Sequence, residues 1–268
     1  MIDFIFGDAG SGKSTYIYKW ITQEAESHPD RSYFLFVPEQ HTLKAQRELI
    51  RYSSRNGMLN LDVLSFQLLA YRVMDELGIE KPVMLDEVSK SILIRKAVIE
   101  AADELEVYKR KINSAGFVNQ IKSLISELYQ YDVDIDRLKE AGRESGVPLL
   151  SAKINDVYTI YKHFRDKLTE RAVIPEETAY LLLSYISASA LLNDAVVVFD
   201  SYTGFTPIQI KIIEHIMTKA ARVRFSVTIP REAGPYRSNN DISDLYWMSR
   251  ETVSALCKAG ERNSVKNA

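Results

Sequence analysis

The sequence predicts an α/β fold in which a parallel sheet, flanked by helices, is interrupted by an all-helical segment. Short apolar runs rich in β-branched and aromatic residues recur between stretches of helical periodicity. The three strongest runs do not alternate apolar with polar residues, which is typical of strands covered on both faces. The alternation of strand and helix stops over residues 86–192 and then resumes.

Five segments are predicted to be strands. The strong ones are residues 2–6, 33–37 and 195–199, and the weaker ones are 59–64 and 222–228. Helices are expected between and after them, because apolar residues recur there at three-and-four spacing. The expected helices cover residues 14–26, 41–54, 66–77, 206–219 and 241–258.

The middle of the chain has a different character. One helical stripe includes Phe117, Ile121 and Leu128, and another includes Val157 and Phe164. A further helix is expected just after residue 175, a proline, and no strand is evident. We therefore expect a discontinuous α/β domain at 1–85 and 193–268, with a helical insertion subdomain at 86–192.

The clearest motif is a glycine-rich loop between the first strand and the first helix. Its sequence is Gly7-Asp8-Ala9-Gly10-Ser11-Gly12-Lys13-Ser14, which matches GxxxxGK[S/T] at every fixed position. In such a loop, backbone N–H groups and the helix N-terminus surround phosphate groups. We expect Lys13 to reach the terminal phosphates of a nucleotide and the Ser14 hydroxyl to bind Mg²⁺, with Thr15 completing the site.

A second candidate is Asp200, which directly follows the apolar run 195–199. A carboxylate at the end of a buried strand can hold Mg²⁺ through water, whereas the alternative is an ordinary helix cap or turn aspartate. In helicase-type ATPases the next residue is a glutamate that serves as general base, but here it is Ser201. A hydroxyl is a poor general base at neutral pH. We therefore expect nucleotide binding with weak or absent hydrolysis, and no catalytic residue.

Four stretches together resemble one family. They are residues 6–15, 37–42 (Val-Pro-Glu-Gln-His-Thr), 63–73 and 199–209 (with Gly-Phe-Thr-Pro). They are similar to the N-terminal region of AddB, the B subunit of the bacterial ATP-dependent helicase/deoxyribonuclease. The long spacing between Lys13 and Asp200 also resembles superfamily 1 helicases. The resemblance implies a P-loop NTPase domain of the RecA-like type that binds ATP with Mg²⁺.

The resemblance further implies partners and a role. AddB pairs with an AddA-type helicase/nuclease subunit, and the two process DNA double-strand breaks for recombinational repair. AddB resembles a helicase without motor function, and its iron–sulfur cluster belongs to a C-terminal nuclease, so we expect this chain to be an N-terminal fragment. The family's DNA contacts fall on His41, Thr42, Ser65 and Phe66, although Ser65 could instead cap a helix and Phe66 could pack in the core.

The composition excludes several classes of protein. The chain has 268 residues, 34 basic and 36 acidic, so its net charge of −2 excludes a strongly basic nucleic-acid binder. The single cysteine excludes an intramolecular disulfide, and no apolar run is long enough for a membrane span, so we expect a cytoplasmic protein. Two alternatives stay open. One is a small-molecule kinase with a helical lid carrying Arg95, Arg110 and Arg137, and the other is a structural module whose loop binds nothing.

Overall fold

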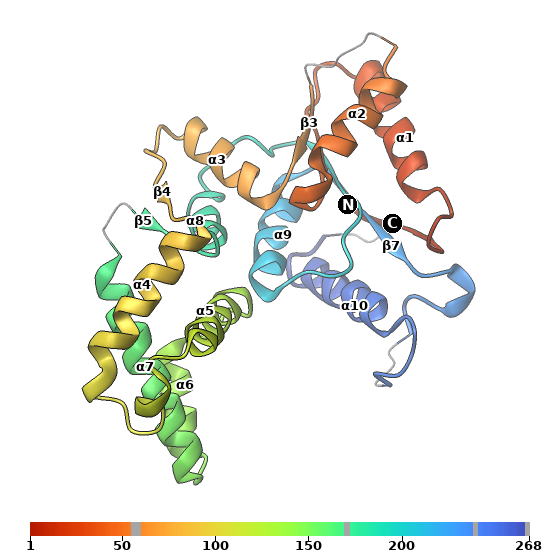
Figure 1. Cartoon of the computed structure of the whole chain (residues 1–268). Helices are drawn as coiled ribbons and strands as arrows, with labels where there is room; N and C mark the ends of the chain where they lie inside the picture. The colour runs from red at the N-terminus through yellow and green to blue at the C-terminus, as the bar shows by residue number, and fades with distance from the viewer. Residues whose placement is uncertain (55–59, 169–171, 238–240, 266–268) are drawn as a thin grey trace. The chain divides into compact units, whose positions relative to one another are not determined.

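The chain, seen in a computed structural model, divides into two compact units (Figure 1). The structure describes residues 1–54, 60–168, 172–237 and 241–265. The first unit comprises Met1–Ile79 with Leu181–Ala268, and the second comprises Glu80–Tyr180. The sequence analysis placed the corresponding boundaries at 85/86 and 192/193.

The first unit contains a five-stranded parallel sheet. Its strands are β1 (Ile2–Gly7), β2 (Tyr33–Phe36), β3 (Leu61–Leu64), β6 (Val196–Phe199) and β7 (Arg222–Thr228). Their order is β1-β7-β6-β2-β3, and every neighbouring pair is parallel. The predicted parallel sheet is confirmed, although residue 59, where one predicted strand begins, lies outside the described residues.

Helices cover both faces of this sheet. They are α1 (Lys13–Ser27), α2 (Thr42–Tyr52), α3 (Phe66–Glu76), α9 (Pro207–Lys219) and α10 (Trp247–Arg262). Because side chains alternate across a strand, Leu35 and Val198 pack with Ile17 of α1 and Leu49 of α2 on one face. The opposite face carries Phe225, which lies beneath α9 and α10. The flanking helices of the predicted α/β fold are thus also confirmed.

A row of phenylalanine rings crosses that second face. Phe4, Phe225, Phe199 and Phe36 come from four neighbouring strands, and each is in register with the next. Their ring centroids are 5.7, 4.9 and 4.8 Å apart along the row, in stacked geometry. Aromatic pairs at such distances stabilise a sheet beyond the area they bury. The row therefore fixes the register of four strands at one level.

Local signals set the helix ends. Thr206 forms a capping box with Gln209 at the start of α9. The predicted helix 241–258 was wrong at its start, because α10 begins at Trp247. The side chains of Asp241 and Asp244 accept hydrogen bonds from backbone N–H groups two residues ahead, and such local bonds favour turns over helix.

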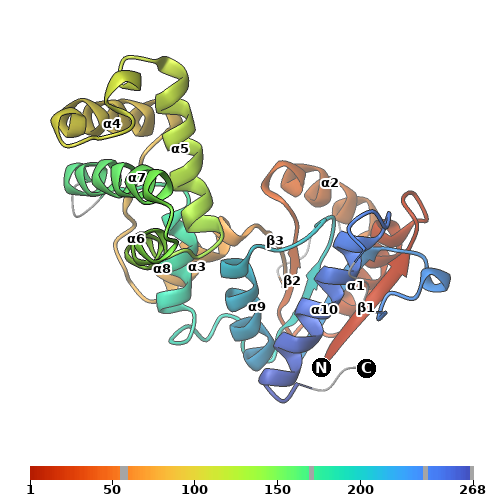
Figure 2. The ribbon, with the colours of Figure 1, turned by 90° about the horizontal axis from the view of Figure 1, so that it is seen from below.

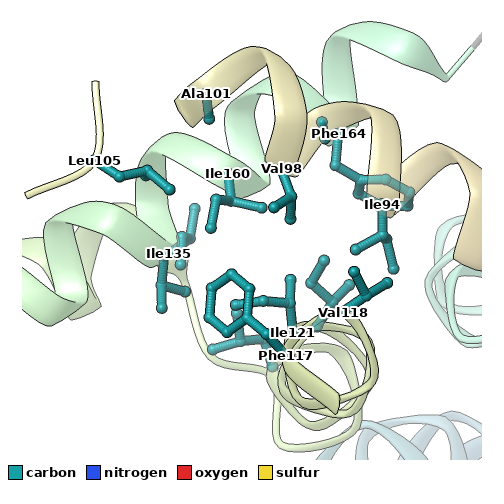
Figure 3. Close-up of a cluster of buried hydrophobic side chains, with 14 of the residues drawn as sticks. Ile94, Val98, Ala101, Leu105, Phe117, Val118, Ile121, Ile135, Ile160 and Phe164 are labelled. Carbon is teal, nitrogen blue, oxygen red and sulfur yellow. The ribbon is translucent and has the colours of Figure 1, made fainter. Parts of the chain in front are cut away.

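The second unit is a helical bundle. It contains α4 (Glu87–Glu100), α5 (Ala115–Gln130), α6 (Ile135–Glu144), α7 (Pro148–Lys167) and the start of α8 (Glu177–Tyr185). Two single 3₁₀ turns of this unit, η2 and η3, cover Ala101–Asp103 and Lys109–Lys111. The other two, η1 and η4, belong to the first unit and cover Glu39–His41 and Arg231–Ala233. Helices α4 and α7 lie side by side (Figure 2), and Ile94, Phe117, Ile121 and Phe164 meet in the core (Figure 3).

The prediction that residues 86–192 contain no strand was wrong at residues 172–173, which pair with a short strand just before that segment. Strand β4 (Val83–Met84) pairs in parallel with β5 (Ala172–Val173). Each strand has two residues, which is too few for an apolar run or an alternation to be visible in the sequence. The pair joins the two ends of the helical segment.

A buried ion pair lies inside the helical unit. The Lys90 side chain is fully buried, and its Nζ donates to Glu176 Oε1 at 2.6 Å and to Ser126 Oγ at 2.9 Å. Burial alone raises the pKa of Glu176, but the hydrogen bonds from Lys90 and Ser126 outweigh it and hold that pKa below its ordinary value. The pair links α4, α5 and the segment before α8.

Replacing Glu176 by alanine should destabilise the helical unit by at least about 3 kcal/mol, because it leaves the Lys90 ammonium buried without its counter-charge. Urea unfolding followed by circular dichroism measures the change. The control is Asp103→Ala, which removes the exposed ion pair with Lys109 and should cost less than about 1 kcal/mol. Equal effects of the two substitutions would contradict the assignment.

The stabilisation that Glu176 contributes should depend on pH in a defined direction. Since the pKa of Glu176 is lower in the folded state, its stabilisation is complete above the ordinary value of 4.5 and is lost as the pH falls through the folded-state pKa. The difference in unfolding free energy between the wild type and Glu176→Ala should therefore shrink below pH 4.5.

Candidate functional site

The glycine-rich loop connects β1 to α1 and leaves the start of the helix open. Gly10 and Gly12 have φ angles of 75° and 89°, which glycine adopts without steric cost. Gly12 caps α1 without any side-chain hydrogen bond. A side chain at Gly7 would meet Ser11 Oγ, which lies 2.5 Å from the position of an added Cβ. The loop therefore presents backbone N–H groups at a helix N-terminus, where an anion is stabilised.

Lys13 folds back over this loop. Its Nζ donates to the carbonyl oxygens of Gly7 and Asp8, at 2.9 and 2.8 Å. Burial lowers the pKa of Lys13 more than the nearby carboxylates of Asp200 and Asp8 raise it. The ammonium group thus lies at the mouth of the loop, hydrogen-bonded to two carbonyl groups that a phosphate oxygen could replace.

Asp200 follows β6 directly and is 1% exposed. Its carboxylate accepts hydrogen bonds from Ser226 Oγ at 2.5 Å and from Ser201 Oγ at 3.3 Å. Burial and the hydrogen-bonded Asp200 carboxylate raise the pKa of Tyr18 well above its ordinary value. The Tyr18 phenol therefore stays neutral beside the Asp200 carboxylate.

The loop and Asp200 meet in one pocket of about 380 Å³. Strand β7 lies between β1 and β6, so the loop and Asp200 are two strand spacings apart, or about 10 Å. The lining residues come from the loop and the start of α1 and from the carboxyl-terminal ends of β6 and β7. They are Ala9, Gly10, Ser11, Gly12, Lys13, Ser14, Thr15, Asp200, Ser201, Tyr202, Thr203, Ser226 and Thr228. The structure thus brings together the two motifs predicted separately.

The donor set suits a hydrated magnesium ion. Mg²⁺ prefers oxygen ligands, keeps several waters and binds through one or two side chains together with substrate phosphates. The Ser14 hydroxyl and the Asp200 carboxylate are oxygen donors lining the same pocket. Among the described residues, no group of three or more His, Cys, Asp or Glu side chains could hold a metal by itself.

Ser201 has an unusual backbone conformation. Its φ is 65°, in the left-handed region that few residues other than glycine adopt. It lies where helicase-type ATPases place their glutamate. Asp194, the nearest other acid of that strand, precedes β6 and so lies at its opposite end. The described part of the pocket therefore has Asp200 as its one lining carboxylate.

The four predicted DNA contacts lie at the ends of neighbouring strands β2 and β3. Ser65 is 4% exposed and caps α3 by accepting from the Leu68 N–H. The Phe66 ring packs 5.9 Å from Phe36 and 6.0 Å from Phe199. His41 ends η1, and Thr42 Oγ1 donates to the Glu39 carbonyl oxygen at 2.9 Å. All four are partly or largely buried, with His41, Thr42 and Phe66 in the intermediate range.

The sequence analysis missed three residues of the site. Ser226 donates to Asp200, the Asp200 carboxylate influences the pKa of Tyr18, and Tyr246 donates from its hydroxyl to Asp8 Oδ1 at 3.2 Å. Ser226 was detectable, because the run 222–228 alternates polar with apolar residues and so places Ser226 on the polar face of that strand. Tyr18 and Tyr246 match no motif, since their roles depend on distant segments.

Comparison with known proteins identifies the family. The profile described as "ADDB, N-terminal" matches residues 4–268. The chain belongs to this family. The members named here are each called the B subunit of an ATP-dependent helicase/deoxyribonuclease. That of Lachnoclostridium phytofermentans is 32% identical over 256 residues, which cover 95% of this chain and 22% of that protein. That of Clostridioides difficile is 34% identical over 273 residues, 98% of this chain and 23% of that protein.

A third AddB relative, from Alkaliphilus metalliredigens, is 34% identical over 252 residues, covering 94% of this chain and 22% of that protein. The chain thus spans less than a quarter of the length of these relatives. The predicted AddB resemblance is confirmed over nearly the whole chain. No helix in the described residues is both long and apolar enough to cross a membrane.

Replacing Ser201 by glycine should stabilise the fold by up to about 1 kcal/mol, because glycine removes the steric cost of the left-handed conformation. The control is Ser114→Gly, at φ −85°, where the serine makes no capping hydrogen bond. There glycine should be neutral or destabilising, because it only adds freedom to the unfolded chain. Chemical unfolding compares the two. A loss of stability in Ser201→Gly would show that the Ser201 hydroxyl outweighs the backbone cost.

Proposed function

We propose that the first unit is a RecA-like P-loop domain that binds ATP with Mg²⁺. The observation that carries this proposal is the convergence of the glycine-rich loop and Asp200 on one pocket. When bound, Mg²⁺ would supply charge neutralisation for the phosphates. The loop N–H groups and Lys13 would hold the phosphates, and Ser14 and Asp200 would hold the ion.

The proposed site is built for binding more than for turnover. Hydrolysis needs a group that orients and deprotonates water, and Ser201 is not such a base. The hydroxyls of Ser226 and Ser201 donate to Asp200 and hold its carboxylate in place. We therefore propose weak or absent hydrolysis by this domain.

We propose that this chain is the N-terminal, helicase-like part of the B subunit of a helicase/deoxyribonuclease. The whole complex would act in recombinational repair of DNA double-strand breaks. Family membership supports this role, because the relatives carry that subunit name. Its partner would be an AddA-type helicase/nuclease subunit in the cytoplasm, and an iron–sulfur cluster would belong to another part of the protein. His41 and Thr42, at the end of β2, are proposed to contact DNA, and Ser65 and Phe66 to support that edge from the neighbouring strand end, as the cap of α3 and as part of the ring cluster.

Lys13→Ala should weaken ATP binding by about 100-fold, because it removes a charged donor to the terminal phosphates. Isothermal titration calorimetry with Mg²⁺ measures the affinity. Lys19→Ala, an exposed lysine of the same helix, is the matched control and should bind as the wild type does.

The variant Asp200→Asn tests the proposed Mg²⁺ site separately from nucleotide binding. It should reduce affinity for Mg²⁺–ATP while leaving ATP binding in excess chelator unchanged. If neither the wild type nor Lys13→Ala binds ATP or ADP at millimolar concentration, the structural-module alternative is correct.

Phosphate release by the purified chain should stay at the background rate, with or without single-stranded DNA, because the pocket lacks a general base. A coupled phosphate assay measures this. Robust DNA-stimulated turnover would contradict the role given to Ser201, and phosphate transfer to a small acceptor would favour the kinase alternative.

A further inference from the structure

Strand β1 lies at the edge of the sheet but has the composition of an interior strand. Among the described residues, β7 is its one partner strand. Its sequence, IDFIFG, contains a single charged side chain, Asp3, which is buried against Arg224 of β7. Edge strands are normally short or charged, because a long apolar edge invites pairing with another strand. The opposite edge strand, β3, is of that kind, since it has four residues and its Asp62 pairs with Arg72.

The backbone of β1 directs hydrogen-bonding groups toward this edge. The Val223 N–H donates to the Met1 carbonyl oxygen at 2.8 Å. Residues of a strand alternate between its two sides, so Asp3 and Ile5 face β7, whereas the N–H groups of Phe4 and Phe6 point toward the open edge. A strand placed there would pair with these groups.

A cluster of aromatic rings lies beside the same edge. The rings of Phe4 and Phe6 stack with their centroids 5.6 Å apart, and Tyr236 meets both of them edge-on. Tyr236 is 64% exposed, and with Arg231 and Arg237 these rings line a hollow of about 670 Å³. The hollow has room for apolar side chains that a further strand would project from alternate positions.

The connections between the strands determine which segment can reach this edge. A crossover between parallel strands is nearly always right-handed. Helix α1 connects β1 to β2 over one face, whereas α9 connects β6 to β7 in the opposite direction over the other face. Because α10 follows β7 on the same face as α9, a right-handed crossover continues in the direction of β1. The position next to β7 is filled by β1, so the free position is the outer edge of β1.

Helix α10 has the direction and the length that this crossover needs. It starts beside the carboxyl end of β7, where Ser249 Oγ donates to the Thr228 carbonyl oxygen at 2.8 Å. It then runs beside α9 (Figure 2), where Arg262 forms an ion pair with Glu214. Its 16 residues span about 24 Å, and the seven residues of β7 span about 23 Å. The helix therefore returns the chain to the edge at which a parallel strand begins.

We propose that the polypeptide beyond residue 268 forms a parallel strand on the outer edge of β1, with apolar side chains that cover Phe4, Phe6 and Tyr236. This inference rests on the proposed function, which makes this chain the N-terminal part of a longer subunit. The chain spans less than a quarter of the length of its relatives. The occupant of the edge is thus the same polypeptide, and the sheet gains a sixth strand.

The test uses the full-length subunit carrying Tyr236→benzoylphenylalanine, a photoreactive aromatic residue. On irradiation it should cross-link to a peptide within about 20 residues after position 268, because the connection and the strand are both short. Mass spectrometry of the digested protein identifies the product. The matched control is Leu43→benzoylphenylalanine, since Leu43 is 67% exposed on α2, which packs near β3 at the other edge. It should give no cross-link to that segment.

Amide hydrogen exchange is an independent measurement on the unmodified full-length subunit. The N–H groups of Phe4 and Phe6 should exchange within about tenfold of the rate of Ile5, which faces β7 and serves as the internal reference. At an open edge they would exchange at least about 100-fold faster than Ile5, because only water would accept from them.

Other outcomes overturn the inference. Cross-links from position 236 only to the partner subunit, to a second copy or to a distant part of the chain would assign the edge to that occupant. Absence of any cross-link to the segment after position 268 overturns it as well, and fast exchange at Phe4 and Phe6 would then show that the edge is open. Nucleotide binding is measured separately with Lys13→Ala. If the cross-link forms and ATP does not bind, the proposed nucleotide site fails and the added strand stands.

Discussion

The row of four phenylalanines is the constraint on which the site depends. Phe4, Phe225, Phe199 and Phe36 lie at one level of the sheet, so four strands share one register. A slip of one residue would turn each ring to the opposite face, where α1 and α2 pack. Asp200 is the residue after Phe199, and the glycine-rich loop begins three residues after Phe4. The stacking that holds the sheet therefore also sets the distance between the loop and Asp200.

Asp200 shows how this sheet accommodates a buried charge. A carboxylate at 1% exposure is costly unless hydrogen bonds replace its water. Ser226 comes from the neighbouring strand and Ser201 from the residue that follows Asp200, so the donors belong to the same strand ends that form the pocket. Removing the Ser226 donor would leave an acceptor partly unsatisfied, at a cost of about 1–3 kcal/mol. Binding geometry and fold stability are thus coupled at this residue.

Much of the first unit could be predicted from the sequence, because its signals are local. Apolar runs located the five strands, and the loop motif is contiguous between Gly7 and Ser14. The missed features depend on distance in space. Tyr18 acts on Asp200 across a long sequence separation, and β4 and β5 exist only as a pair. The start of α10 was missed because the turns at Asp241 and Asp244 also supply polar residues that a helix tolerates.

Helix α4 marks a different limit of sequence patterns. Its apolar residues point in nearly all directions, so periodicity does not say which face enters the core. The structure separates them, because Lys90 is buried with Glu176 on the inner side whereas Arg95 lies between exposed isoleucines on the outer side. A buried lysine with a buried partner stabilises a unique packing within the unit. An exposed arginine is hydrated and needs no counter-charge, so the two cations of α4 are stabilised in different ways although the sequence pattern does not distinguish them.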